Sequence, residues 1–275
     1  MTRRRAAPAF AEDTSRTVPD VPEAQPPYNP LDRVELGRSV ERALLAQPLG
    51  PLPPSASFAG AGLYAIYYVG DFEAYRAITP PRRDTGDVPL YVGRAIPRGA
   101  RAGAGGLLPT TTEPVLFQRL REHGRSIEQV ERHADEAAQP NLRLSDFRCR
   151  YLVADDIWVP LGEALLIGHY QPVWNQLLQG FGNHDPGAGR RRCARPDWDE
   201  VHPGRPWVAL HELPGRPIAA SLAAINEQLS RLGRPDLDAT PPLTPDIAAA
   251  IDDDPGGPQI STATETTSEL EGGGD

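Results

Sequence analysis

The chain has 275 residues, of which 39% are hydrophobic, so it is long enough to bury the core of one or two domains. Its formal net charge of −9 argues against a nucleic-acid binder, but ten of its 37 acidic residues lie from Asp236 onward, where there is no arginine, and the rest is close to neutral. Two distant cysteines, Cys149 and Cys193, exclude a disulfide framework, and neither a signal peptide nor a membrane-spanning stretch is apparent, so we expect a soluble, cytoplasmic protein.

The first half of the chain alternates between loops and short regular elements. Residues 1–27 are rich in proline, alanine and mixed charge, which is typical of a flexible arm. Apolar residues at helical spacing predict a helix from about Leu31 to Leu45. Strands are expected at 63–69 and 90–93, because both are apolar, the first is rich in tyrosine, and glycines bound them.

The second half begins with Pro114 at a first helical turn, which predicts a helix to about His123. Ser126 and Gln129 resemble a capping box that opens a further helix to about residue 138. Alternating residues predict a third strand at 147–153, and an apolar helix follows from 160 to 170.

The C-terminal part is expected to be loop-like from residue 180 to about 205. A last helix is predicted at 218–232, within a C-terminal helical segment at 216–235. Residues 236–275 form an acidic, low-complexity tail. No internal repeat is apparent.

Six residues in a fixed order connect these elements. Tyr64 lies in Gly62-Leu63-Tyr64 of the first strand, and Tyr91 in Tyr91-Val92-Gly93 of the second. The later positions are Arg119, His123, Glu163 and Asn175. This order resembles the GIY-YIG nuclease superfamily. The segments 180–187, 190–192 and 202–205, with Trp198, further resemble the Type II restriction endonucleases that cut a palindrome made of G and C only.

The resemblance implies an α+β fold in which a small, mainly antiparallel three-stranded sheet is flanked by helices, with the endonuclease domain at 28–215. It implies a type II site-specific deoxyribonuclease of a restriction system that cuts double-stranded DNA, with CCGCGG as the expected site. A palindromic target further implies a homodimer. A cognate DNA methyltransferase is expected in the same host, although not as a stable complex.

The chemistry of these residue types matches phosphodiester hydrolysis. Glu163 would hold one Mg²⁺, for which Mn²⁺ is the expected substitute, because this ion keeps several waters. Arg119 would clamp the phosphate. Tyr64 is the candidate that faces the attacking water and passes a proton to His123, and which of the two is the final base stays open. Tyr91 would hold the phosphate or water, and Asn175 would orient Glu163 or the phosphate.

Every candidate also has a structural explanation. Strand tyrosines are usually core aromatics, while Arg119 and His123 could form a solvated helix face. Glu163 could be an acidic residue of the first helical turn, and Asn175 a turn former. Asp155 and Asp156 are rival metal ligands, but we expect them to cap the next helix. The set His184, Cys193 and His202 fits no familiar zinc site; His133 is expected on a helix surface and His169 at a helix end.

Arginines in two loops are the candidates for DNA contacts, since guanidinium groups bind phosphates and guanine edges. They are Arg94, Arg98, Arg101, Arg190, Arg191 and Arg192. Arg94 departs from the superfamily pattern, in which many members have lysine. Each of these arginines could instead be a solvated loop residue. Two other functions stay open: a GIY-YIG nuclease of repair or homing, and a non-catalytic DNA-binding module.

Overall fold

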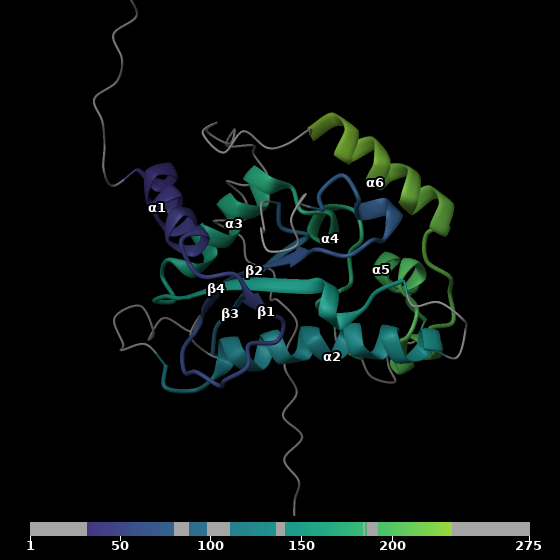
Figure 1. The fold of residues 1–275 in the computed structure, drawn as a ribbon, viewed down its shortest axis with the longest axis horizontal. Coiled ribbons are helices and arrows are strands. Elements are labelled where there is room, and N and C mark those ends of the chain that lie inside the picture. The colour runs from purple at the N-terminus through teal and green to yellow at the C-terminus, as the bar shows by residue number, and fades with distance from the viewer. Residues whose placement is uncertain are drawn as a thin grey trace, which may run out of the picture.

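Strand β2 (Gly62–Tyr68) is the centre of the fold, because all seven of its apolar or aromatic residues are buried. It pairs antiparallel with β3 (Tyr91–Ala95) on one side and with β4 (Phe147–Val153) on the other. The two-residue strand β1 (Gly50–Pro51) adds to β4, so that the order is β1-β4-β2-β3 (Figure 1). This computed structural model describes residues 32–79, 88–97, 111–135, 141–183, 185 and 192–232.

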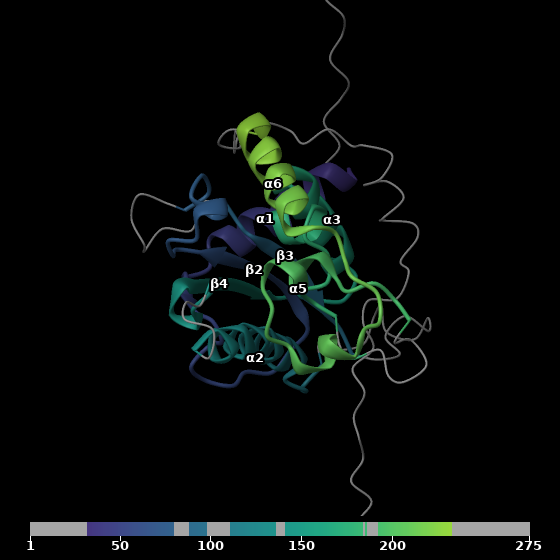
Figure 2. The same cartoon turned by 90° about the vertical axis from the view of Figure 1, so that its right-hand side faces the viewer.

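Helices cover both faces of the sheet, and the alternation of side chains along β2 divides the core between them. Its even-numbered residues face a core that includes α2 (Val115–Asp135), and its odd-numbered residues face one that includes α1 (Arg33–Leu45) and α3 (Val159–Tyr170). Figures 1 and 2 show α2 below the sheet and α1 and α3 above it. The chain therefore has two hydrophobic layers separated by one sheet.

Three further helices and three 3-10 turns complete the described part of the fold. The helices are α4 (Val173–Gln176), α5 (Asp197–Val201) and α6 (Ile218–Leu232), and the 3-10 turns are η1 (Glu73–Tyr75), η2 (Leu144–Asp146) and η4 (Pro206–Leu210). Helix α6 joins the core through Ile225, which is fully buried. Within the described residues, no helix is long and apolar enough to cross a membrane.

Helix α2 is one continuous helix, so the prediction of two helices was wrong. Ser126 and Gln129 lie inside it, where the chain is already helical and no new helix can begin. Gly124 does not break the helix; it allows close packing, since a Cβ there would lie 2.9 Å from a carbon of Pro53. Ile127 and Val130 are buried and continue the apolar face of the first half.

The other elements agree with the expected α+β fold and need four corrections. The sheet has a fourth strand, β1, which is too short to leave a sequence pattern. Glu163 lies beyond the first turn of α3, because that helix begins at Val159. Trp158 is the N-cap of α3 and no side chain hydrogen bond caps it there, so Asp155 and Asp156 do not have the expected capping role.

The fourth correction concerns the expected loop at 180–205, which contains helix α5. The predicted helices at 31–45, 160–170 and 218–232 and the three predicted strands are confirmed within two residues at each end. The predicted arm at 1–27 and tail at 236–275 lie outside the described residues.

Candidate active site

The two strand motifs are neighbours in the sheet, and close packing explains the glycine in each of them. Gly62 lies against β4, and a Cβ at this position would be 2.0 Å from the carbonyl oxygen of Leu152. Gly93 pairs with Tyr64 across the β2 and β3 ladder, and a Cβ there would be 2.5 Å from the Tyr64 hydroxyl. The glycine of the second motif therefore makes room for the tyrosine of the first.

The Tyr64 hydroxyl lies 2.5 Å from Nε2 of His123, and both side chains are buried. Arg119, one turn earlier on α2, hydrogen-bonds to the hydroxyls of Tyr64 and Tyr91. Burial raises the pKa of Tyr64 well above its usual value of 10.0, Tyr91 adds to this, and the charge of Arg119 opposes it. Two predicted tyrosines and the predicted arginine and histidine thus share one hydrogen-bonded cluster.

Tyr64 differs from the expectation in one respect: it is 0% exposed and does not face water. Its hydroxyl contacts His123, and the segment 180–183 packs on that histidine. Phe181 stacks on His123 at 4.5 Å between ring centroids and 16° between planes. Any proton that leaves Tyr64 for His123 therefore moves in a space from which bulk water is excluded.

Arg119 is only 7% exposed, and several protein groups hold its guanidinium in place. It donates to the carbonyl oxygen of Gly182 at 2.9 Å and to Glu122 Oε2 at 3.2 Å. Burial by itself would lower the pKa of Arg119, but the two tyrosines and Glu122 outweigh it and raise the pKa. The side chain is thus a permanent positive charge in a fixed orientation.

A cavity of about 280 Å³ borders this cluster on the side of α2. Arg119 and His123 contribute to its wall, opposite Gly182, Asn183 and Trp207. The rest of its lining is Glu122, Arg125, Ser126, Gln129, Phe181 and Asp185. An anionic group that enters the cavity would meet the guanidinium of Arg119 beside the imidazole of His123.

Glu163 reaches the same cluster from α3. Its negative charge raises the pKa of both Tyr64 and Tyr91. Arg94 of β3 forms an ion pair with it, with 3.0 Å between Nε and Oε2, and 15% and 19% of these side chains are exposed. Arg94 was expected to contact DNA from a loop. It lies instead in strand β3 and is paired with Glu163, the candidate metal ligand.

The donors around Glu163 fit a magnesium ion better than a softer metal. No group of three or more histidines, cysteines or carboxylates occurs in the part of the chain that the structure describes. One partly exposed carboxylate beside tyrosine hydroxyls suffices for Mg²⁺, which keeps most of its waters and takes further oxygens from a phosphate. Zinc would require several nitrogen or sulfur ligands.

Asn175 is placed differently from the prediction that it orients Glu163 or the phosphate. Its Oδ1 accepts from the backbone N–H of Val92 at 2.8 Å, and its Nδ2 donates to the carbonyl of Val92 at 2.8 Å. Strand β3 is at the edge of the sheet, so this amide takes the place of a neighbouring strand. Asn175 therefore positions β3, which carries Tyr91 and Arg94.

The remaining candidates lie outside this cluster. His202 is buried and bonded to Tyr75, Cys193 is exposed, and His184 lies outside the described residues, so the structure lends no support to a zinc site here. His133 is exposed on α2, and His169, at the end of α3, pairs with Glu41 at 2.7 Å. Among the loop arginines, Arg192 is exposed, whereas Arg98, Arg101, Arg190 and Arg191 lie outside the described residues.

Sequence reasoning missed the residues that cover the cluster. Phe181, Gly182 and Arg205 were noted only as parts of segments that resemble a family. The available signal was an aromatic residue between two glycines, which indicates a backbone that approaches other groups closely. Nothing local to Arg205 indicates that it is buried.

Comparison with known proteins identifies one family. The family model of the Eco29kI GIY-YIG domain matches residues 56–232, a range that holds all six candidate residues and helix α6. A search of curated proteins found no match.

Proposed function

The chain belongs to the family of the Eco29kI GIY-YIG domain, a type II restriction endonuclease family, and on that premise we propose that it is a magnesium-dependent, site-specific deoxyribonuclease. The observation that carries the proposal is the 2.5 Å contact between the Tyr64 hydroxyl and His123 Nε2, with Arg119 on the same hydroxyl. A proton acceptor and a fixed cation thus lie side by side, as hydrolysis of a phosphate ester requires.

The proposed proton path runs from a water that must reach the buried Tyr64 hydroxyl when DNA binds, to Tyr64 and on to His123. Because burial raises the pKa of Tyr64, a stable tyrosinate is disfavoured, and the hydroxyl must release its proton as it accepts another. His123 accepts that proton at Nε2 and becomes the final base. The attacking water forms a bond to phosphorus, the bond to the leaving oxygen breaks, and solvent supplies the proton for the leaving oxygen.

Arg119 is assigned to the phosphate in this scheme. The negative charge that grows on the phosphate oxygens is stabilised by a guanidinium that is already oriented by Gly182 and Glu122. Glu163 would hold the magnesium ion, which when bound would neutralise phosphate charge and help the leaving oxygen depart. Arg94 lies beside Glu163 and can move its positive charge to the phosphate when the carboxylate takes another partner.

We further propose that the natural substrate is a short GC palindrome such as CCGCGG, cut as a defence against foreign DNA. One cluster per chain and two strands per target call for a homodimer, in which each protomer cuts one strand. A methyltransferase that protects the same site in the host is the expected counterpart. Mn²⁺ is expected to replace Mg²⁺, since both accept oxygen ligands in octahedral geometry.

Two alternatives stay open and predict different products. A repair or homing nuclease would cut at lesions or at a long site, and a non-catalytic module would bind DNA without cutting it. The complete set of Tyr64, His123, Arg119 and Glu163 within one cluster favours an active enzyme over the non-catalytic module.

Cleavage of a plasmid of known sequence tests the proposal. With Mg²⁺, the protein should give discrete fragments whose mapped ends share one palindrome, and EDTA should abolish cutting. Glu163→Gln should still bind the fragment that carries the site but not cut it. DNA binding without cleavage by the wild type would overturn the proposal, and cutting only at lesions would favour a repair nuclease.

A further inference from the structure

Arg205 is a buried arginine that the proposed mechanism does not use. It lies just before the η4 turn, and 3% of it is exposed. Asp199 of α5 accepts from its Nε at 2.6 Å and from its Nη2, and both side chains are 1% exposed. Burial raises the pKa of Asp199, whereas the hydrogen bonds and charge of Arg205 oppose that rise.

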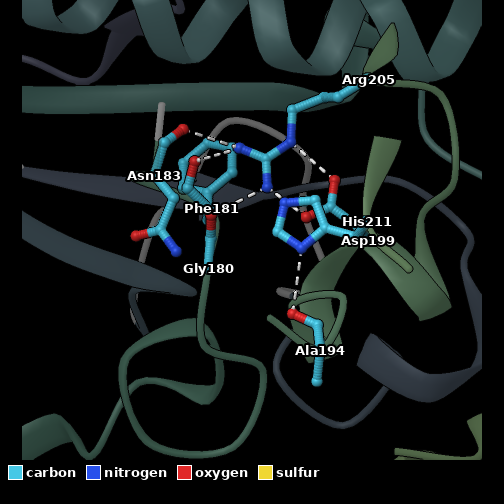
Figure 3. A network of polar contacts seen from close by, with 7 residues as sticks. All are labelled: Gly180, Phe181, Asn183, Ala194, Asp199, Arg205 and His211. Atoms are coloured by element: carbon cyan, nitrogen blue, oxygen red, sulfur yellow. Dashed lines mark hydrogen bonds and ion pairs between the residues drawn. The ribbon is translucent and has the colours of Figure 1, made fainter. Parts of the chain in front are cut away.

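All five N–H donors of Arg205 are in use. Besides the two bonds to Asp199, Nη1 donates to the carbonyls of Phe181 and Asn183, each at 3.1 Å, and Nη2 donates to the carbonyl of Gly180 at 2.9 Å. Figure 3 shows these three carbonyls converging on one guanidinium. Arg205 therefore fixes the backbone of the loop 180–183 at three points.

Two tryptophans fix the guanidinium itself. Its central carbon lies 4.8 Å from the ring centroid of Trp198 and 4.7 Å from that of Trp207. Buried cation–π contacts of this kind add to the attraction of the ion pair. A lysine could not replace this arrangement, because an ammonium has three donors and no flat face.

The loop 180–183 touches the catalytic cluster on its other side. The carbonyl of Gly182 accepts from Arg119, while Phe181 stacks on His123 and meets Tyr91 edge-on at 5.1 Å. A Cβ at Gly182 would lie 2.8 Å from Arg119 Nη2 and 2.9 Å from the Tyr91 hydroxyl. The loop thus connects Arg205 to the cluster through direct contacts.

We propose that Arg205 is a positioning residue for DNA cleavage: it holds the loop 180–183 so that Gly182 orients Arg119 and Phe181 fixes and shields His123. The inference rests on the nuclease function proposed above. It predicts that Arg205 affects the rate of the chemical step and the titration of His123, and has little effect on the affinity for DNA.

Single-turnover cleavage of a DNA fragment across a range of pH tests this inference. In Arg205→Lys the maximal rate should fall by about 10- to 100-fold, as expected when catalytic groups are misplaced by a fraction of an ångström to one ångström. DNA affinity, measured with Ca²⁺ in place of Mg²⁺, should change by less than about threefold. The acid limb of the rate profile should also shift, because His123 loses its cover.

Arg150→Lys is the matched control, since Arg150 donates to Gln47 and lies over Tyr67 on the opposite face of the sheet. It should destabilise the fold without moving the pH profile. Gly182→Ala is a second test of the loop. Its methyl group would displace Arg119, while the hydrogen bonds of Arg205 to the loop stay intact. This variant decides the question if Arg205→Lys does not fold.

In the Arg119→Lys background, Arg205→Lys should lower the rate less than it does in the wild type, because the part of its effect that passes through Gly182 and Arg119 is already lost. A folded Arg205→Lys, or failing that a folded Gly182→Ala, with wild-type rate and pH profile would overturn the inference. If the wild type cuts no DNA, the proposed function fails, and the positioning role fails with it. Failure of the inference alone is recognised by an active wild type.

Discussion

Two buried pairs of a tyrosine and a histidine occur among the residues that the structure describes, and they differ in what surrounds them. Tyr64 and His123 are 2.5 Å apart, and so are Tyr75 and His202. In the second pair, Trp174 donates to Tyr75, and Asn141 lies 3.1 Å from Nδ1 of His202. A short hydrogen bond between a phenol and an imidazole is therefore not in itself an active site.

The neighbours of the first pair are charged, and those of the second pair that shift its pKa values are neutral. Arg119 and Glu163 both act on Tyr64, whereas Tyr75 is affected by burial, Trp174 and Tyr68. His123 also borders the cavity, while His202 is fully buried and its pKa is lowered by burial to about 3. A fixed cation, a carboxylate and a bordering cavity thus distinguish the first pair from the second.

The largest effect is expected when the tyrosine hydroxyl is removed from each pair in turn. Tyr64→Phe should lower the single-turnover cleavage rate by about 10²- to 10⁴-fold, the range of general acid–base catalysis, with little loss of DNA affinity. Tyr75→Phe should cut at the wild-type rate but unfold at a lower temperature, because Trp174 loses its acceptor. Equal effects of the two changes on the rate would show that the pairs do not differ in function.

A second prediction concerns Glu163, the carboxylate that acts on the first pair. Glu163→Gln should lose at least about 100-fold in cleavage rate while it keeps DNA binding, because an amide holds a hard cation poorly. Glu41→Gln is the control: Glu41 is a buried carboxylate that pairs with His169. A Glu163→Gln protein that cuts at the normal rate would remove Glu163 as the metal ligand.

A smaller effect is expected when the first pair is disturbed through the backbone. Gly93→Ala places a methyl group 2.5 Å from the Tyr64 hydroxyl and should lower the rate by about 10-fold or more, since the hydroxyl must move away from His123. Gly50→Ala has open space around it and should leave the rate unchanged. Plasmid cleavage by both variants under the same conditions measures the ratio; a ratio near one would argue against the steric role of Gly93.

The last prediction concerns stability and leaves the cleavage rate aside: the second pair should make stability depend on pH. The pKa of His202 is about 3 in the folded protein, below its unfolded value of 6.5, so the folded state binds fewer protons. The contribution of His202 is complete above pH 6.5 and is lost as the pH falls from there towards 3, by at most about 1.4 kcal/mol per pH unit. In urea titrations of His202→Gln, the free energy of unfolding should fall less steeply than in the wild type over this pH range.

His133→Gln is the control for that measurement, because His133 is exposed on α2. Its stability should follow the wild-type pH dependence. If His202→Gln also follows the wild type, another group causes the acid-induced loss.

Features that depend on neighbours in the sequence could be predicted from the sequence. Helix α6 and the three main strands follow from local periodicity. The cluster of Tyr64, Arg119 and His123 is a distant contact that was expected only through the resemblance to a family. The two-helix prediction for 114–138 failed because a capping signature is local, whereas continuity of α2 depends on the buried face of the whole helix.

Features that depend on distant contacts could not be predicted. Asn175 bonds to Val92, 83 residues away, and that partner leaves no signal in its own surroundings. His123, the partner of Tyr64, is covered by Phe181 from a later loop, and that loop is held by Arg205. Sequence reasoning thus found residues that meet in the candidate site and missed the groups that hold them in place.

The unbroken helix α2 has a mechanical consequence. Its 21 residues form a rod of about 30 Å, and one wall of the cavity, from Arg119 to Gln129, belongs to this single stiff body. The rest of the lining comes from Phe181, Gly182, Asn183, Asp185 and Trp207. If the cavity widens to admit a polymer, the movement must therefore come from the loop 180–183 and not from α2. The contacts of Arg205 with that loop limit how far it can move.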